Sequence, residues 1–114
     1  MNAVAGHLFK AVPAKLAEEL FDVLVSAENV RIERIVSRGH ASPHDFWYDQ
    51  EQHEFVLLVS GRARLAFADG SPSRELAAGD WLVLPAHQRH RVDWTDPEQE
   101  TVWLAVHYGP RNHT

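Results

Sequence analysis

Short segments rich in Val, Ile, Leu and Trp follow one another from Phe21 onward, separated by turn residues at fairly even spacing. Runs of this length and composition are typical of β-strands. No helical pattern lies between them, so the sequence predicts an antiparallel β-sandwich or barrel rather than an α/β fold. The predicted strands are residues 21–26, 30–37, 54–61, 62–70, 73–76, 80–85, 90–94 and 101–108.

The two ends of the chain differ from this pattern. The segment PAKLAEEL, residues 13–20, has a proline where a helix can begin, and it predicts a short helix in an N-terminal extension. The final residues, GPRNHT, are expected to be frayed. The length of 114 residues fits one domain, 1–114, with its conserved barrel core at about 28–108.

Composition narrows the classes of function. The net charge of −5 is the wrong sign for a nucleic-acid surface, and no apolar stretch approaches the ~20 residues that cross a bilayer. The N-terminus lacks the pattern of a signal peptide, which predicts a cytoplasmic protein. Because the chain has no cysteine, any metal must be held by histidine, carboxylate or amide groups.

The run of residues 55–59, FVLLV, is apolar on both faces of its predicted strand. A strand with one face in water should alternate, so something must cover the outer face. The N-terminal segment of the same chain or a second copy could do so. We expect a homodimer, because a second copy is the commoner cover for a small barrel.

Two segments combine a glycine with a titratable side chain at a fixed spacing, and they carry the candidate site residues. EFVLLVSG places Glu54 seven residues before Gly61, and GDWLVLPAHQRH runs from Gly79 through Pro85 to His90. These segments resemble the two motifs of the cupin superfamily of small β-barrels, in particular small single-domain members. His87 stands where the second motif has its third glycine. The resemblance implies an all-β jelly-roll barrel with a metal or small-molecule site inside.

One part of the first motif is missing, because a typical cupin has His-x-His three or four residues before the glutamate. Those positions hold Tyr48 and Gln50, or Trp47 and Asp49 with one more loop residue. We expect Tyr48 and Gln50 to face inward, since an uncharged amide tolerates a dry cavity better than a second carboxylate near Glu54. Asp49 would face inward only with a bound metal. Residues 51–53 are expected to form an exposed connection.

Strand periodicity predicts which side chains share the cavity. Residues two apart lie on one face, so Glu54 should point inward, and His90 and Trp94 should point inward together. Glu54 and His90 form either a buried ion pair or, with Gln50 or Asp49, a weak site for Zn, Mn, Fe or Ni. Tyr48 and Trp94 are the candidate contacts to a bound molecule.

The other histidines have simpler interpretations. His40, His44 and His87 lie in predicted loops, where a solvated ring is the default. His53 should face outward, at the surface or an interface, and His107 could line the pocket or merely pack.

Three functions are compatible with these residues. The first is a binding module for a small molecule or a weakly held metal. The second is a metal-dependent cupin enzyme, a dioxygenase, isomerase or lyase acting on a small polar substrate, which only the resemblance supports. The third is a non-catalytic interaction barrel with a filled interior. No nucleophile elbow, phosphate loop or dinucleotide fingerprint is present.

Overall fold

The computed structural model describes residues 2–109, which form eight strands and no helix. The frayed end predicted for GPRNHT lies outside these residues from 110 onward. None of the described residues belongs to a helix that could span a membrane. The strands are β1 Leu20–Ala27, β2 Val30–Ser37, β3 His53–Ser60, β4 Arg62–Phe67, β5 Arg74–Ala77, β6 Trp81–Leu84, β7 His90–Thr95 and β8 Thr101–Tyr108.

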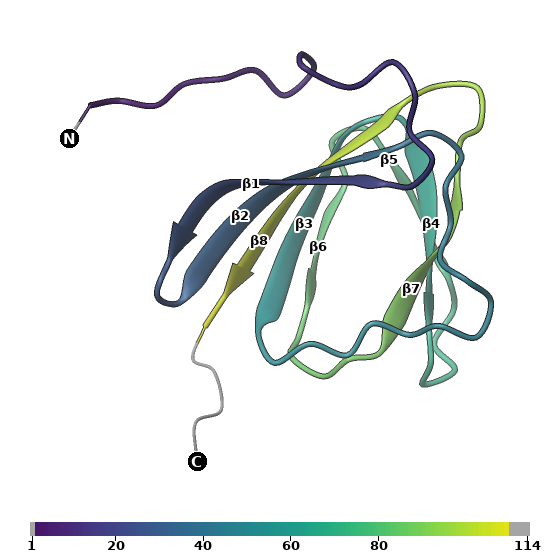
Figure 1. Ribbon diagram of the computed structural model, residues 1–114. Helices are drawn as coiled ribbons and strands as arrows, with labels where there is room; N and C mark the ends of the chain where they lie inside the picture. The colour runs from purple at the N-terminus through teal and green to yellow at the C-terminus, as the bar shows by residue number, and fades with distance from the viewer. Residues whose placement is uncertain (1, 110–114) are drawn as a thin grey trace.

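Two antiparallel sheets face each other (Figure 1). The larger sheet has the order β1-β2-β8-β3-β6, and the smaller has the order β5-β4-β7. The all-β, jelly-roll prediction is therefore confirmed. No strand pairs across the two sheets within residues 2–109, so the barrel is open at the side rather than a closed cylinder.

The predicted N-terminal helix is wrong. Residues 13–20 are irregular until β1 begins at Leu20, because side chains of the barrel bind the carbonyls that a helix would need. Arg38 donates to the Ala14 carbonyl at 2.9 Å, and His40 donates to the Leu16 carbonyl at 3.1 Å.

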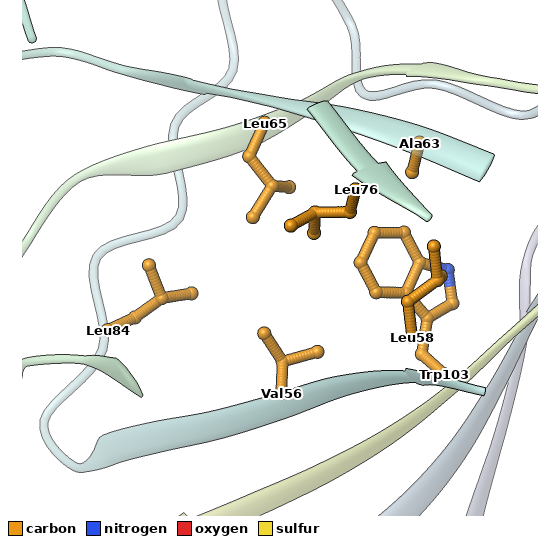
Figure 2. Packing of buried hydrophobic residues seen from close by; sticks show 7 residues of the cluster. All are labelled: Val56, Leu58, Ala63, Leu65, Leu76, Leu84 and Trp103. Atoms are coloured by element: carbon orange, nitrogen blue, oxygen red, sulfur yellow. The ribbon is translucent and has the colours of Figure 1, made fainter. Parts of the chain in front are cut away.

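The hydrophobic core lies between the two sheets at the end where β3 turns into β4. Val56 and Leu58 of β3 face Ala63 and Leu65 of β4, and the indole of Trp103 packs beside them (Figure 2). Leu58 and Ala63 are 0% and 1% exposed. This cluster fixes the spacing of the sheets and leaves the opposite end of the interior to other side chains.

Gly61 makes the crossing from the larger sheet to the smaller one. Its φ is +92°, and a Cβ atom there would lie 2.5 Å from the Thr101 Cα. Only glycine combines this backbone conformation with so close an approach. The close approach of Thr101 therefore explains why the first motif needs a glycine at this position.

The outer face of the larger sheet is largely apolar. The N-terminal segment covers the part around Arg34, whose guanidinium donates to the carbonyls of Leu8, Lys10 and Ala11. The rest includes exposed Trp81 and Val83, with 61% and 43% of their surface in solvent. The apolar side chains on this face outside the Arg34 region include Val25, Val30, Ile32, Phe55, Leu57, Trp81, Val83, Leu104 and Val106.

We predict that this outer face joins two copies of the chain. Trp81→Arg should convert the dimer to a monomer in light scattering at micromolar concentration, because a tryptophan buried in an interface commonly contributes about 2 kcal/mol or more. Trp94→Arg is the matched control, since Trp94 is an exposed tryptophan on the smaller sheet. A monomeric wild-type protein would contradict the prediction.

Candidate functional site

One end of the barrel interior carries a row of polar side chains on three neighbouring strands. In the strand register, Glu54 of β3 lies opposite His107 of β8, which lies opposite Arg31 of β2. His90 comes from β7 in the facing sheet, and its ring nitrogen Nε2 is 3.8 Å from the Glu54 Oε1. The two cupin-like segments therefore meet across the interior, as the sequence predicted.

A cavity of about 270 Å³ opens beside this row. Its apolar wall belongs partly to the core, and Val56, Leu65, Leu84 and Trp103 in Figure 2 are shared by both. The lining side chains are Glu19, Phe21, Arg31, Glu33, Ile35, Tyr48, Gln50, Glu54, Val56, Leu65, Leu84, His90, Val92, Trp103 and His107.

Glu54 and His90 are both buried, with 7% and 6% of their surface exposed. The imidazole of His90 donates from Nδ1 to the Gln88 carbonyl at 3.0 Å, which leaves Nε2 as the nitrogen that faces the carboxyl group. The 3.8 Å between Nε2 and Oε1 exceeds hydrogen-bond distance. A third group that lies in the cavity beside the pair can therefore be within hydrogen-bond distance of both.

Burial changes the protonation of both groups. It raises the pKa of Glu54 to about 7, and the negative charge of Glu33 adds to this rise, while a hydrogen bond from Gln50 and the charge of Arg31 oppose it. Burial lowers the pKa of His90. Near neutral pH the site thus holds a carboxyl group that readily gains or loses a proton beside a neutral imidazole.

A second polar group lies next to this pair. His107 donates from Nε2 to the Glu33 Oε1 at 3.0 Å, and the Arg31 Nε lies 3.3 Å from the other oxygen, Oε2. Burial and the charge of Arg31 lower the pKa of His107, although Glu33 counteracts them. His107, whose role the sequence left open, therefore lines the cavity.

The predicted register of the polar stretch is confirmed in part. Tyr48 and Gln50 line the cavity, and the Tyr48 ring stacks on His90 with centroids 5.4 Å apart. Burial raises the pKa of Tyr48, and the negative charges of Glu19, Glu54 and Glu33 raise it further. The Asp49 carboxylate lies outside, where it accepts a hydrogen bond from His87 at 2.7 Å.

The exposed connection predicted for residues 51–53 is wrong at two positions. Gln52 is buried, because its amide donates to the carbonyls of Asn29 and Gly109. His53 starts β3 half-buried and accepts a hydrogen bond from the Ala86 backbone amide at 3.0 Å. Only Glu51 is exposed as predicted.

The prediction that Trp94 faces inward with His90 is also wrong. The pairing of β4 with β7 shifts between Arg64 and Leu65, which pair with Trp94 and Val92, so Asp93 is an extra residue. This β-bulge reverses the alternation beyond it. Thr95 becomes buried, while Trp94 is 37% exposed and lies outside the cavity lining.

The loop histidines lie outside the cavity lining. His40 accepts from the Arg38 amide at 2.9 Å and thereby helps to hold the N-terminal segment. His87, exposed as predicted, has a φ of +64°, a left-handed conformation that glycine, the residue expected here in the cupin motif, adopts readily. His44 is exposed.

Sequence reasoning missed Glu19, Arg31 and Glu33 as cavity residues. Arg31 and Glu33 alternate with Val30 and Ile32 along β2, and periodicity alone assigns such a polar face to solvent. The opposite face of β2 carries the apolar residues Val30, Ile32 and Val36. That apolar face could have indicated that β2 is covered on its outer side, so that Arg31 and Glu33 line the interior. Glu19 precedes β1, and burial raises the pKa of its carboxyl group, which accepts from the Ser37 hydroxyl at 2.7 Å.

Comparison with known proteins decides the family. The model of the cupin domain matches residues 35–107, more than half of the chain. The chain belongs to the cupin family. No match was found among curated protein sequences.

Solved structures agree with this membership. A Ralstonia eutropha JMP134 protein, named as a candidate mannose-6-phosphate isomerase, is 46% identical and superposes with a TM-score of 0.89, over 95% of this chain and 100% of its own. A cupin superfamily protein of Desulfitobacterium hafniense DCB-2 is 18% identical, with a TM-score of 0.70 over 87% of this chain and 84% of its own. A polyketide cyclase of Streptomyces resistomycificus is 16% identical, with a TM-score of 0.74 over 98% and 83%. The last two show the shared fold.

The side chains of this cupin do not fit a tightly held metal. Within residues 2–109, no group of three or more His, Cys, Asp or Glu side chains is arranged to hold an ion. Glu54 and His90 face each other, but the third position is the amide of Gln50, and His107 is engaged by Glu33. A neutral amide is a poor ligand for Zn, Mn, Fe or Ni compared with imidazole or carboxylate.

We predict that Glu54 makes stability fall as pH rises. A carboxyl group whose pKa rises from 4.5 to about 7 on folding binds more protons in the folded state between these values, so the free energy of unfolding should fall by about 3 kcal/mol across that window. The lowered pKa of His90 has the opposite effect below 6.5. Urea denaturation of wild type and Glu54→Gln from pH 4 to 8 isolates the Glu54 contribution, and equal slopes would contradict it.

We also predict that Gln50→His creates a metal site. The new imidazole would join Glu54 and His90, and affinity for Zn²⁺ or Ni²⁺ measured by calorimetry should rise by roughly one to two powers of ten. Asp49→His is the matched control, because Asp49 lies outside the cavity. Equal gains in both variants would mean that position 50 is not a ligand position.

Proposed function

We propose that this cupin binds a small polar molecule inside its barrel, between Glu54 and His90. The observation that carries the proposal is the 3.8 Å separation of a buried carboxyl group and a buried imidazole that face one cavity. A ligand atom in the cavity beside the two groups can lie within hydrogen-bond distance of both the His90 Nε2 and the Glu54 Oε1, and would link them.

The size and lining of the cavity support the same function. A volume of about 270 Å³ lies just below the ~300–1,000 Å³ usual for ligand pockets, which favours a compact molecule. An open cavity also favours binding over the alternative of a filled interaction barrel. The poor metal donor set favours direct contact between the molecule and protein side chains.

The test is binding of a defined panel by ligand-observed NMR, with glycerol, mannose, mannose 6-phosphate and glycolate as probes. Affinity for the panel members that bind should fall about tenfold or more in His90→Leu, because one buried hydrogen-bond partner is lost. Glu75→Gln, on exposed β5, is the control. No binding by any member, or binding that His90→Leu leaves unchanged, would contradict the proposal.

Proton-transfer catalysis is the second candidate function. A carboxyl group with a pKa of about 7 beside a neutral imidazole suits general acid–base chemistry, as an isomerase or lyase requires. The name of the Ralstonia relative points to the isomerase class. Recording the same NMR samples in D₂O over hours distinguishes turnover, seen as product signals and solvent deuterium uptake, from binding alone.

A further inference from the structure

The cavity changes from polar to apolar along the strands. Its first row contains Arg31, His107 and Glu54, with His90 facing them from β7. Two rows further along the same strands, the corresponding positions hold Ile35, Trp103 and Leu58.

The smaller sheet also changes from polar to apolar along the cavity. Val92 and Leu65 pair two residues beyond His90 and Phe67, and both line the cavity. The exception among the lining residues at this end is Glu19, whose carboxyl group accepts a hydrogen bond from the Ser37 hydroxyl at 2.7 Å. Apart from Glu19, a molecule in the cavity therefore meets polar groups at one end and hydrocarbon at the other.

The polar end alternates charges of opposite sign. Glu33 uses one oxygen for His107 and the other for Arg31. The buried Nε atom of Arg31 nevertheless makes no hydrogen bond within the described part of the chain. Glu54 lies on the other side of His107 in the same row. The Nε atom of Arg31 is shielded beside Glu33, but the Arg31 side chain is 38% exposed and lines the cavity. An incoming group therefore meets its guanidinium as a donor and Glu54 and His90 as acceptors.

We propose that the cavity takes a small amphipathic alcohol, with its hydrocarbon body against Ile35, Leu65 and Trp103 and its uncharged hydroxyl head at the Arg31–Glu54–His90 end. This inference rests on the proposed binding function and specifies the chemical class of the ligand. A hydroxyl group both donates and accepts, so it matches a site that offers both capacities.

A charged head group fits less well in either sign. An anion would face the Glu33 carboxylate and share the row with Glu54, while a cation would face the Arg31 guanidinium. Like charges at short distance in a partly dry site are strongly unfavourable. The phosphate of a sugar phosphate would meet the same repulsion, so the inferred ligand class differs from the one in the name of the Ralstonia relative.

Three probes that differ only in the head group test this inference. They are 4-fluorobenzyl alcohol, 4-fluorobenzylammonium and 4-fluorobenzoate, and their binding to the intact protein at pH 7 is measured by fluorine NMR. The alcohol should bind at least about tenfold more tightly than either ion. Nuclear Overhauser contacts should join the ring protons to the methyl groups of Ile35 and Leu65.

Two charge variants should change the preference in opposite directions. Glu33→Gln keeps an acceptor oxygen but removes the negative charge, so benzoate affinity should rise about tenfold. Arg31→Met keeps the volume and removes the positive charge, so benzylammonium affinity should rise by a similar factor. The exposed variant Glu75→Gln should leave all three affinities unchanged.

Each other outcome has a definite meaning. Tightest wild-type binding by benzoate or benzylammonium would overturn the uncharged head, and ring contacts at the Glu54 end would overturn the orientation. If a polar compound of the panel above binds through His90 but no ring probe binds, the amphipathic class is wrong while the proposed function stands. If nothing binds, both are wrong.

Discussion

The contact between the Gly61 backbone and Thr101 determines how the two sheets meet. With Thr101 Cα only 2.5 Å from where a side chain would begin, the chain can leave β3 and enter β4 only through a residue without a Cβ atom. This crossing brings the smaller sheet over the larger one and sets Leu58 against Ala63 in the core. The distance between Glu54 and His90 at the opposite end follows from the same spacing.

The polar end of the interior differs from the core in what holds it together. At the core end, Val56, Leu58 and Trp103 are stabilised by burial of apolar surface alone. At the other end, His107 is hydrogen-bonded to Glu33 and Arg31 is ion-paired with it, but within residues 2–109 the Arg31 Nε makes no hydrogen bond and Glu54 and His90 do not meet. Buried polar groups that are incompletely paired reduce stability, and proteins tolerate this mainly at functional sites.

The sequence predicts the fold well because strand length and turn spacing are local properties. All eight strands lie where the short apolar segments predicted them, within a few residues. The inward position of Tyr48 and Gln50 could also be predicted, since the cupin resemblance gives two registers counted back from Glu54 and an uncharged amide tolerates the cavity better than the Asp49 carboxylate.

The errors arise where a distant part of the chain decides the outcome. Gln52 is buried because it bonds carbonyls 23 and 57 residues away, which no local pattern reveals. The N-terminal helix is absent because Arg38 and His40 take up its carbonyls. Arg31 and Glu33 were missed because a polar strand face normally lies in solvent, whereas here it lines the cavity and the N-terminal segment contacts the other face at Arg34.

The bulge at Asp93 is a place where this scaffold can lose a residue without rebuilding its interior. In a regular strand, adding or removing one residue changes the side of every residue that follows. At the bulge, Val92 pairs with Leu65 and Trp94 pairs with Arg64, so loss of Asp93 would leave Trp94 on the outer face and Thr95 in the interior. Among descendants of one ancestral cupin, a single-codon deletion at this position would therefore spare the cavity, whereas the same deletion inside a regular strand would exchange its inner and outer faces.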